Sequence, residues 1–175
     1  MYSVQLDEVA SNLENLGKPK LASQLDIVAN TIDKFAGVER EAEIRIPLEE
    51  VPVVVLKEGK VELIEQAFIA QADGTDVRIR KTSVQDEKGE QKDSYTMTAK
   101  HRPLDQEAET DITEEIFSGL MPIAEKLMSK TRYKWNGWDV DNIQAGNLAG
   151  TIVAEYEYGE DEKTVAVPVD WKIKA

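Results

Sequence analysis

Residues 39–46 read Glu-Arg-Glu-Ala-Glu-Ile-Arg-Ile, and the alternation in this stretch decides the fold expected for the chain. On a β-strand, successive side chains point to opposite faces of the sheet. One face then carries a ladder of charges spaced by about 6.7 Å, made of Glu39, Glu41, Glu43 and Arg45. The opposite face is apolar. For this strand alone, a solvated sheet face and a face built to bind ions are both open interpretations.

The same alternation recurs along the chain, and the charges are sorted by strand. Basic side chains share one face in three stretches, at Arg78 and Arg80, at Lys100 and Arg102, and at Lys130 and Arg132. Acidic side chains share one face in three others, at Glu107 and Glu109, at Asp139 and Asp141, and at Glu155 and Glu157. Independent solvated faces have no reason to be sorted in this way, so the pattern favours a face that binds ions.

The composition excludes several classes of function. The 175 residues carry 21 Lys and Arg against 34 Asp and Glu, a net charge of −13, which argues against binding nucleic acid by general electrostatics. The chain has no Cys, which excludes thiolate zinc sites and Cys nucleophiles, and its one His argues against a His-rich metal site and most Ser-His-Asp triads. We expect neither a signal peptide nor a membrane span, and therefore a cytoplasmic protein without a nucleic-acid or membrane partner.

The first part of the chain predicts a helical hairpin. Apolar residues recur at helical spacing over residues 4–35, and Gly17 and Pro19 separate two amphipathic helices. The apolar stripe of each helix needs a partner, either the body of the protein, which we favour, or a second copy in a homodimer. We therefore expect two parts, a hairpin over residues 1–37 and a second domain over residues 38–175.

The rest of the chain predicts a mainly antiparallel α+β fold. The strands are expected at residues 39–47, 61–71, 75–83, 94–102, 107–112, 130–135, 138–143 and 150–158, with a short pairing at 164–167. A helix is expected from Thr113, as its N-cap, to residue 128, with a kink at Pro122. Residues 47–52 are expected to link two strands, and residues 86–93 to form a polar hairpin loop.

The charged face leads to a chemical interpretation. In a flat sheet the helices would cover the apolar face; in a closed barrel the charged face would line the lumen. A lumen of Glu and Arg cannot be a dry core, because buried unpaired charge is very costly, so it would be a wet cavity for an ionic ligand. Carboxylates without His or Cys suit Mg²⁺ or Mn²⁺, and clustered Arg and Lys suit phosphate. Together they indicate a metal–polyphosphate complex.

At this point the motifs resemble a known family, the CYTH superfamily of triphosphate tunnel metalloenzymes. The resemblance begins with Glu41-Ala-Glu43-Ile-Arg45 and continues in the family's order over about residues 39–172. Its further motifs are 64–69, Val77-Arg-Ile-Arg80, Tyr95-Thr-Met-Thr-Ala-Lys100, Glu107-Ala-Glu109, Lys130-Thr-Arg-Tyr133, Trp138-Asp-Val-Asp141 and 148–157. The family's hallmark Lys is Arg45 in this chain, which keeps the charge but not the proton-donor chemistry.

The resemblance implies an eight-stranded antiparallel closed β-barrel, the triphosphate tunnel, with helices packed outside. It implies Mg²⁺ or Mn²⁺ as cofactor, held by Glu41, Glu43, Glu107, Glu109, Asp141, Glu155 and Glu157, of which Glu41, Glu43, Glu155 and Glu157 are catalytic. It implies phosphate binding by Arg45, Arg78, Arg80, Lys100, Arg102, Lys130 and Arg132.

The function expected from this set is a metal-dependent phosphohydrolase that acts on a small triphosphate, either inorganic tripolyphosphate or a nucleoside triphosphate. Two alternatives stay open. One is a class IV-type adenylyl cyclase, which needs a nucleoside pocket. The other is a non-catalytic protein that binds a polyphosphate or a nucleotide.

Overall fold

The computed structural model describes residues 2–35, 37–38, 41–46, 51–72, 74–104 and 106–158, with side chains for residues 6–29, 42–46, 51–72, 74–104 and 106–158. It has the predicted α+β class. None of the described helices is long and apolar enough to cross a membrane. The expected pairing at residues 164–167 and the side chain of Glu39 lie outside the described residues.

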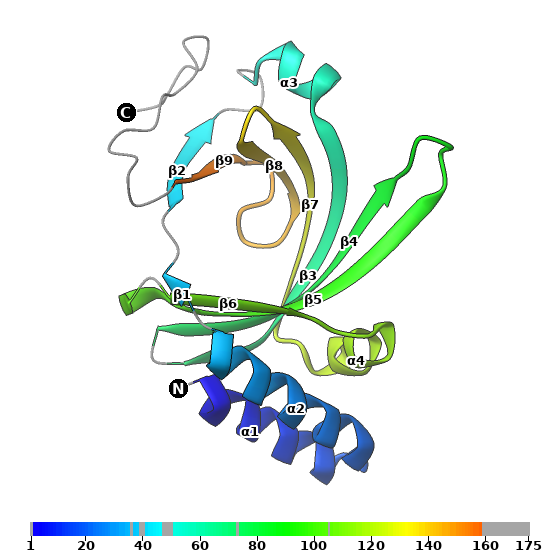
Figure 1. Ribbon diagram of the computed structural model, residues 1–175, viewed down its shortest axis with the longest axis vertical. Coiled ribbons are helices and arrows are strands. Elements are labelled where there is room, and N and C mark those ends of the chain that lie inside the picture. The colour runs from blue at the N-terminus through cyan, green and yellow to red at the C-terminus, as the bar shows by residue number, and fades with distance from the viewer. Residues whose placement is uncertain are drawn as a thin grey trace. The chain divides into compact units, whose positions relative to one another are not determined.

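The strands form a sheet in the order β1-β6-β5-β4-β3-β7-β8-β9-β2 (Figure 1). Their bounds are β1 Gly37–Val38, β2 Glu41–Ile46, β3 Lys60–Ala72, β4 Thr75–Gln85, β5 Gln91–His101, β6 Gln106–Asp111, β7 Lys126–Trp135, β8 Trp138–Ala145 and β9 Ile152–Glu157. Eight strands were predicted, and all eight are confirmed; β1 is additional. The paired strands whose register is described are antiparallel.

The chain divides into two compact units, which are described separately. The first, here the hairpin unit, comprises Met1–Glu39, Gln66–Lys81 and Ser94–Leu127. The second, here the α3 unit, comprises Arg40–Glu65, Thr82–Asp93 and Met128–Ala175. The division expected at residue 37 stays a prediction.

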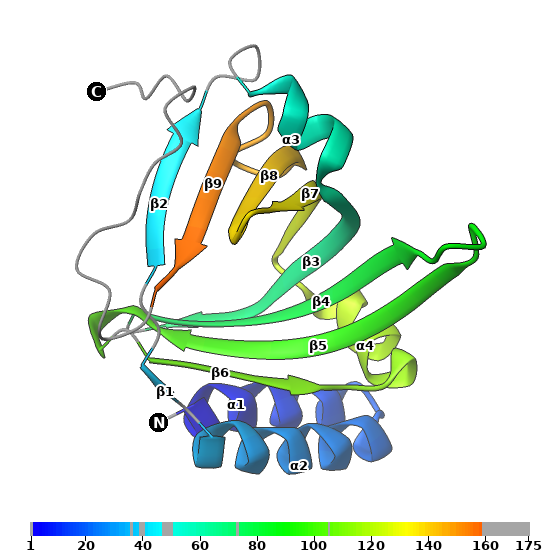
Figure 2. The same ribbon diagram turned by 45° about the horizontal axis from the view of Figure 1, so that its top comes forward.

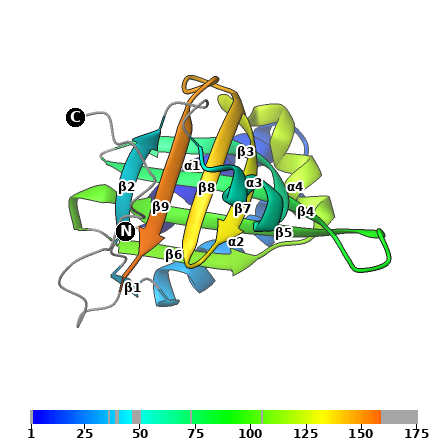
Figure 3. The ribbon, with the colours of Figure 1, turned by 90° about the horizontal axis from the view of Figure 1, so that it is seen from above.

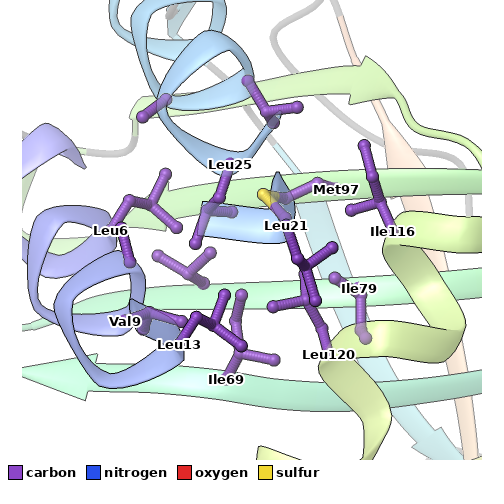
Figure 4. Packing of buried hydrophobic residues seen from close by; sticks show 14 of the residues in the cluster. Leu6, Val9, Leu13, Leu21, Leu25, Ile69, Ile79, Met97, Ile116 and Leu120 are labelled. Carbon is purple, nitrogen blue, oxygen red and sulfur yellow. The ribbon is translucent and has the colours of Figure 1, made fainter. Parts of the chain in front are cut away.

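The hairpin unit contains the two predicted helices, α1 Tyr2–Asn15 and α2 Pro19–Phe35. Gly17 turns the chain between them with a φ of 73°, a conformation that glycine adopts at little cost. Apolar side chains of both helices are buried against one face of the strands in one core cluster (Figure 4). The prediction that the helical stripe packs on the body of the protein is therefore confirmed, whereas a homodimer through the hairpin stays a prediction.

The third helix of the hairpin unit is shorter than predicted. Helix α4 covers Glu114–Leu120, and the Oγ1 of Thr113 accepts a hydrogen bond from the backbone N–H of Ile116 at 3.3 Å, as expected of an N-cap. The predicted continuation to residue 128 is wrong. A short 3₁₀ turn, η3 Met121–Ile123, follows α4, and β7 then begins at Lys126. Pro122 has no backbone N–H and its ring clashes with the preceding turn, so it ends the helix instead of kinking it.

In the α3 unit, strands β7, β8, β9 and β2 lie side by side (Figure 2). A two-residue turn, Asn136-Gly137, joins β7 to β8, and both residues have positive φ, 48° and 83°. Trp138, buried on one face, contacts Tyr156 with ring centroids 5.2 Å apart. Helix α3, Val53–Glu58, was not predicted, and its Val55 packs into the same apolar cluster.

The hairpin between β4 and β5 has a shorter turn than the predicted loop. Both strands continue toward the tip, so only residues 86–90 remain between them. Asp86 organises this turn by accepting hydrogen bonds from the backbone N–H groups of Lys88 and Glu90 at 2.9 and 3.0 Å. Its hydrogen bond with Lys92, followed by these two backbone bonds, lowers the pKa of Asp86.

Candidate functional site

The hairpin unit carries a basic ladder, made of Arg78 and Arg80 on β4 and Lys100 on β5. Their neighbours along each strand, such as Val77, Ile79 and Ala99, are buried in the core beneath the helices. Because side chains alternate on a strand, the basic ladder lies on the face that points away from α1, α2 and α4. The burial pattern of β4 alternates over residues 75–80, which is consistent with the predicted sharing of one face by Arg78 and Arg80.

Two cations of the basic ladder share one carboxylate. Arg78 Nη2 lies 3.3 Å from Glu107 Oε1, and Lys100 Nζ lies 3.7 Å from Glu107 Oε2. Register aids the second contact, because Lys100 and Glu107 are directly opposite on β5 and β6. Glu109 is engaged differently, since its Oε2 accepts a 2.7 Å hydrogen bond from Thr98 Oγ1. Glu107 is thus tied to the phosphate-binding candidates, although the resemblance assigns it to metal.

Arg102 lies beyond the end of its predicted strand. Strand β5 stops at His101, and Arg102 begins a 3₁₀ turn, η2 Arg102–Leu104. Its guanidinium pairs with Asp76 at 2.8 Å, and 61% of its side chain is exposed. His101 points to the other face of β5, where its Nδ1 lies 2.9 Å from the hydroxyl of the buried Thr75. This contact gives His101 a structural role.

The α3 unit brings carboxylates of neighbouring strands into one row. Asp139 on β8 is directly opposite Glu155 on β9, and Glu155 is directly opposite Glu43 on β2. We call these three residues the acidic row. Figure 3 shows the four strands from above, with β8, β9 and β2 as neighbours. Directly opposed side chains on an antiparallel pair have Cβ atoms about 4.5–5.5 Å apart. Like charges at this spacing repel each other, so the acidic row favours a nearby cation.

Arg132 is the cation that the structure places among these carboxylates. Its Nε and Nη2 donate to Asp141 Oδ1 and Oδ2 at 2.7 and 2.8 Å, a bidentate pair. Its Nη1 donates to Asp139 at 2.5 Å, and its Nη2 also donates to Glu155 at 3.1 Å. Lys130 donates a further hydrogen bond to Asp141. Two predicted phosphate ligands therefore bind carboxylates of the same unit.

The buried members of this cluster have shifted pKa values. Burial alone would raise the pKa of Asp141, but the hydrogen bond from Arg132 and the charge of Lys130 outweigh burial and lower it. Burial also opposes the charge of Arg132, yet Asp141, Asp139 and Glu155 raise its pKa. The pKa of Lys130 is lowered, because burial and the charge of Arg132 outweigh the attraction of Asp141. Arg132 and Asp141 therefore form a fully charged pair.

Other predicted ligands of this unit are accessible. Glu43 and Arg45 lie on the same face of β2 and pair with each other at 3.2 Å, with 45% and 66% of their side chains exposed. Glu157 is exposed, and its backbone is opposite that of Glu41, whose side chain is outside the described set. An open hollow of about 400 Å³ adjoins this face. It is lined by Lys134, Trp135, Asn136, Gly137, Trp138, Asp139, Glu155 and Glu157.

The donors of the α3 unit have the chemistry of a hard-cation site without forming a closed one. Oxygen-only donors suit Mg²⁺ or Mn²⁺. Among the side chains that the structure describes, no group of three or more acidic, His or Cys side chains is arranged to hold a metal ion. The acidic row is still the best candidate, because Glu155 and Glu43 are opposed and accessible while Asp141 is enclosed by Arg132 and Lys130.

Sequence reasoning left Asp139 out of the site. Asp139 belongs to the acidic row, and Lys134 is opposite it on β7. The signal was present, since Asp139 shares a strand face with Asp141. Its importance depends on the register between β7, β8 and β9, which strand alternation does not determine.

Comparison with known proteins gave structural neighbours only. No protein-family model and no curated protein sequence matches the chain. The PH1012 protein of Pyrococcus horikoshii is similar with a TM-score of 0.48 and 16% identity, over 71% of this chain and 80% of that one. A candidate adenylate cyclase of Vibrio parahaemolyticus has a TM-score of 0.42 and 14% identity, over 72% of this chain and 78% of that one. A candidate adenylyl cyclase of Hippeastrum, described with a dominant triphosphatase activity, has a TM-score of 0.41 and 13% identity, over 70% of this chain and 80% of that one.

Proposed function

We propose that the protein is a divalent-metal-dependent phosphohydrolase that acts on a small triphosphate, such as inorganic tripolyphosphate or a nucleoside triphosphate. The observation that carries the proposal is the sorting of charge between the two units. The hairpin unit gathers cations in the basic ladder, and the α3 unit gathers carboxylates in the acidic row. A magnesium triphosphate carries anionic oxygens, which match the basic ladder, and a bound cation, which matches the acidic row.

The proposed enzyme has its strand order closed into a barrel, the tunnel of the family that the motifs resemble. The topology supports closure, because β1 and β2 stand at the two ends of the strand order and yet follow each other in the chain. Closure would make the charged face of every strand a lining of one wet cavity. Such a cavity suits an ionic ligand, because charged side chains there keep their water.

On the metal side, the ligands proposed for Mg²⁺ or Mn²⁺ are Glu43, Glu155 and Glu157, with Glu41 as the next residue on the same strand face. When bound, the metal would neutralise phosphate oxygens and lower the pKa of a coordinated water. Glu155 is the central residue of the acidic row, with Asp139 opposite it on β8 and Glu43 opposite it on β2. This placement makes Glu155 the residue whose loss would damage the site most.

On the phosphate side, the basic ladder would bind and orient the triphosphate. Arg78 and Arg80 are spaced two residues apart on one strand face, a separation of about 6.7 Å that suits successive phosphate groups. Arg groups bind phosphate oxygens bidentately, and Lys100 adds a point charge. Phosphoryl transfer is catalysed mainly by positioning and charge stabilisation, so no nucleophilic side chain is required. The absence of Cys and the structural role of His101 agree with that chemistry.

The test is phosphate release by the purified protein from tripolyphosphate and from ATP, with Mg²⁺ and with Mn²⁺. We expect release that needs the metal and falls at least about a hundredfold in Glu155→Gln, the usual scale for loss of a group that stabilises the transition state. The matched control is Glu58→Gln on α3, an exposed carboxylate outside the acidic row, which should keep wild-type rates.

The same assay separates the alternatives. Cyclic AMP formed from ATP would indicate the class IV-type cyclase. Tight metal-dependent binding of tripolyphosphate without turnover would indicate a non-catalytic binding protein. If neither tripolyphosphate nor ATP binds with either metal, the proposed function is wrong.

A further inference from the structure

The guanidinium of Arg132 has the contacts that a bound cation would have. It donates four hydrogen bonds to three carboxylates, two to Asp141 and one each to Asp139 and Glu155. Asp139 and Glu155 are opposed in register and belong to the acidic row. Arg132 therefore neutralises part of the row with a charge supplied by the chain itself.

Arg132 is held more firmly by Asp141 than by Glu155. Asp141 is 2% exposed, binds Arg132 in a bidentate fashion, and also accepts a hydrogen bond from Lys130. Arg132 donates one hydrogen bond to Glu155, at 3.1 Å, compared with two to Asp141, and 28% of the Glu155 side chain is exposed. The Asp141 end is fixed by geometry and burial, and the Glu155 end is accessible to exchange.

We propose that Asp141 is a positioning residue that fixes Arg132 as a resident cation, and that a divalent metal ion has to displace Arg132 from Glu155 in order to bind. This inference rests on the proposed function, since it assumes that Glu155 is a metal ligand. It assigns Asp141 a different role from the metal ligand that the family resemblance implies.

Displacement of Arg132 from Glu155 by the metal would also affect binding of the triphosphate. When Glu155 binds the metal instead of Arg132, the Nη2–H group of Arg132 that donated to Glu155 becomes available to a phosphate oxygen. Asp141 keeps the guanidinium in place. Metal and triphosphate then favour each other's binding through one side chain, which is a coupling free energy between two ligands.

The test uses the paired substitution Arg132→Gln with Asp141→Asn, which leaves the net charge of the cluster unchanged. Binding of Mn²⁺ alone, without any triphosphate, is measured by titration calorimetry and by the Mn²⁺ electron paramagnetic resonance signal. We expect the paired variant to bind Mn²⁺ at least about fivefold more tightly than the wild type, the lower end of ordinary couplings between ligands. Adding Glu155→Gln, either to the wild type or to the paired variant, should abolish Mn²⁺ binding.

The matched control is Lys134→Gln, which removes one cation from the same face of β7. Lys134 is opposite Asp139 in register, so the substitution tests general electrostatics near the row. We expect it to change Mn²⁺ affinity less than about twofold, as for an exposed charge screened by solvent. If the paired variant does not fold, Arg132→Met with Asp141→Leu replaces it, because well-packed apolar pairs can substitute for buried ion pairs.

The outcomes separate the two claims. Tighter Glu155-dependent binding of Mn²⁺ by the paired variant supports the inference, and a purely structural role of Asp141 would not produce it. Unchanged or weaker Mn²⁺ binding, with Glu155-dependent binding by the wild type, overturns the inference and favours Asp141 as a ligand. If neither protein binds Mn²⁺ through Glu155, the proposed function fails and the inference fails with it.

Discussion

The charged faces of the two units are built in different ways. In the hairpin unit, Arg78 and Lys100 share Glu107 at 3.3 and 3.7 Å, at the long end for ion pairs. In the α3 unit, Arg132 binds Asp141 at 2.7 and 2.8 Å, and both residues are buried. On the first face two cations share one carboxylate at these long distances, which suits capture of an anion. The second has buried, closely matched charges, so part of it serves the stability of the fold.

The largest expected effect concerns the buried pair. Asp141→Ala leaves Arg132 and Lys130 without their main carboxylate in a buried place, and breaking such a pair costs ~3–5 kcal/mol. Urea unfolding followed by circular dichroism measures the loss of unfolding free energy. Glu157→Ala, an exposed carboxylate on the neighbouring strand, should change stability by less than about 0.5 kcal/mol. Equal effects of the two variants would show that the Asp141 cluster has no special role in stability.

The next effect concerns metal binding to the acidic row. Because a ligand that binds only the folded state stabilises it, Mn²⁺ at a hundred times its dissociation constant should add ~2.7 kcal/mol to the unfolding free energy. The gain should disappear on chelation and be absent in Glu155→Gln. The measurement is the unfolding free energy with and without Mn²⁺. An identical gain in Glu155→Gln would place the metal elsewhere.

A smaller effect is expected in the basic ladder. Arg78→Gln and Arg80→Gln should each weaken tripolyphosphate binding about tenfold, or ~1.4 kcal/mol, because each removes a charge-assisted contact to phosphate. The free energy of unfolding should change by less than about 1 kcal/mol, as for loosely held ion pairs. Calorimetric titration and urea unfolding test the two parts. The control is Lys88→Gln in the exposed β4–β5 turn, and a large stability loss in Arg78→Gln would contradict the comparison.

The smallest effect is expected at Arg102. Its pair with Asp76 is exposed, and exposed pairs contribute about 0–1 kcal/mol. Arg102→Gln should therefore lower stability by less than about 0.5 kcal/mol and weaken tripolyphosphate binding less than Arg80→Gln does. Urea unfolding measures the change in stability, and calorimetric titration measures the affinity for tripolyphosphate. If Arg102→Gln weakened binding more than Arg80→Gln, the basic ladder would have to extend past the end of β5.

Much of the fold follows from sequence periodicity. Alternation predicted all eight long strands, and helical spacing with Gly17 and Pro19 predicted α1 and α2. Helix α3 was missed because Val-Val-Val after Pro52 is typical of a strand, and packing of Val55 into the core overrides that preference. The predicted length of α4 was wrong because Pro122 ends the helix rather than bending it.

The site could be predicted only in part. Alternation indicates which side chains share a face of one strand, and the burial pattern of β4 agrees with it over residues 75–80. It does not give cross-strand register, so it could not show that Arg132 would bind Asp139 and Asp141. It also could not show that Arg102 would fall beyond the last residue of β5.

The most direct test of the proposed enzyme is steady-state hydrolysis of tripolyphosphate with Mg²⁺ by one variant of each face. We predict that Arg80→Gln, in the basic ladder, raises KM about tenfold with little change in kcat, because it removes binding. We predict that Glu155→Gln, in the acidic row, lowers kcat at least about a hundredfold. No metal-dependent turnover by the wild type, or the same change in both parameters for both variants, would contradict the division of labour between the two faces.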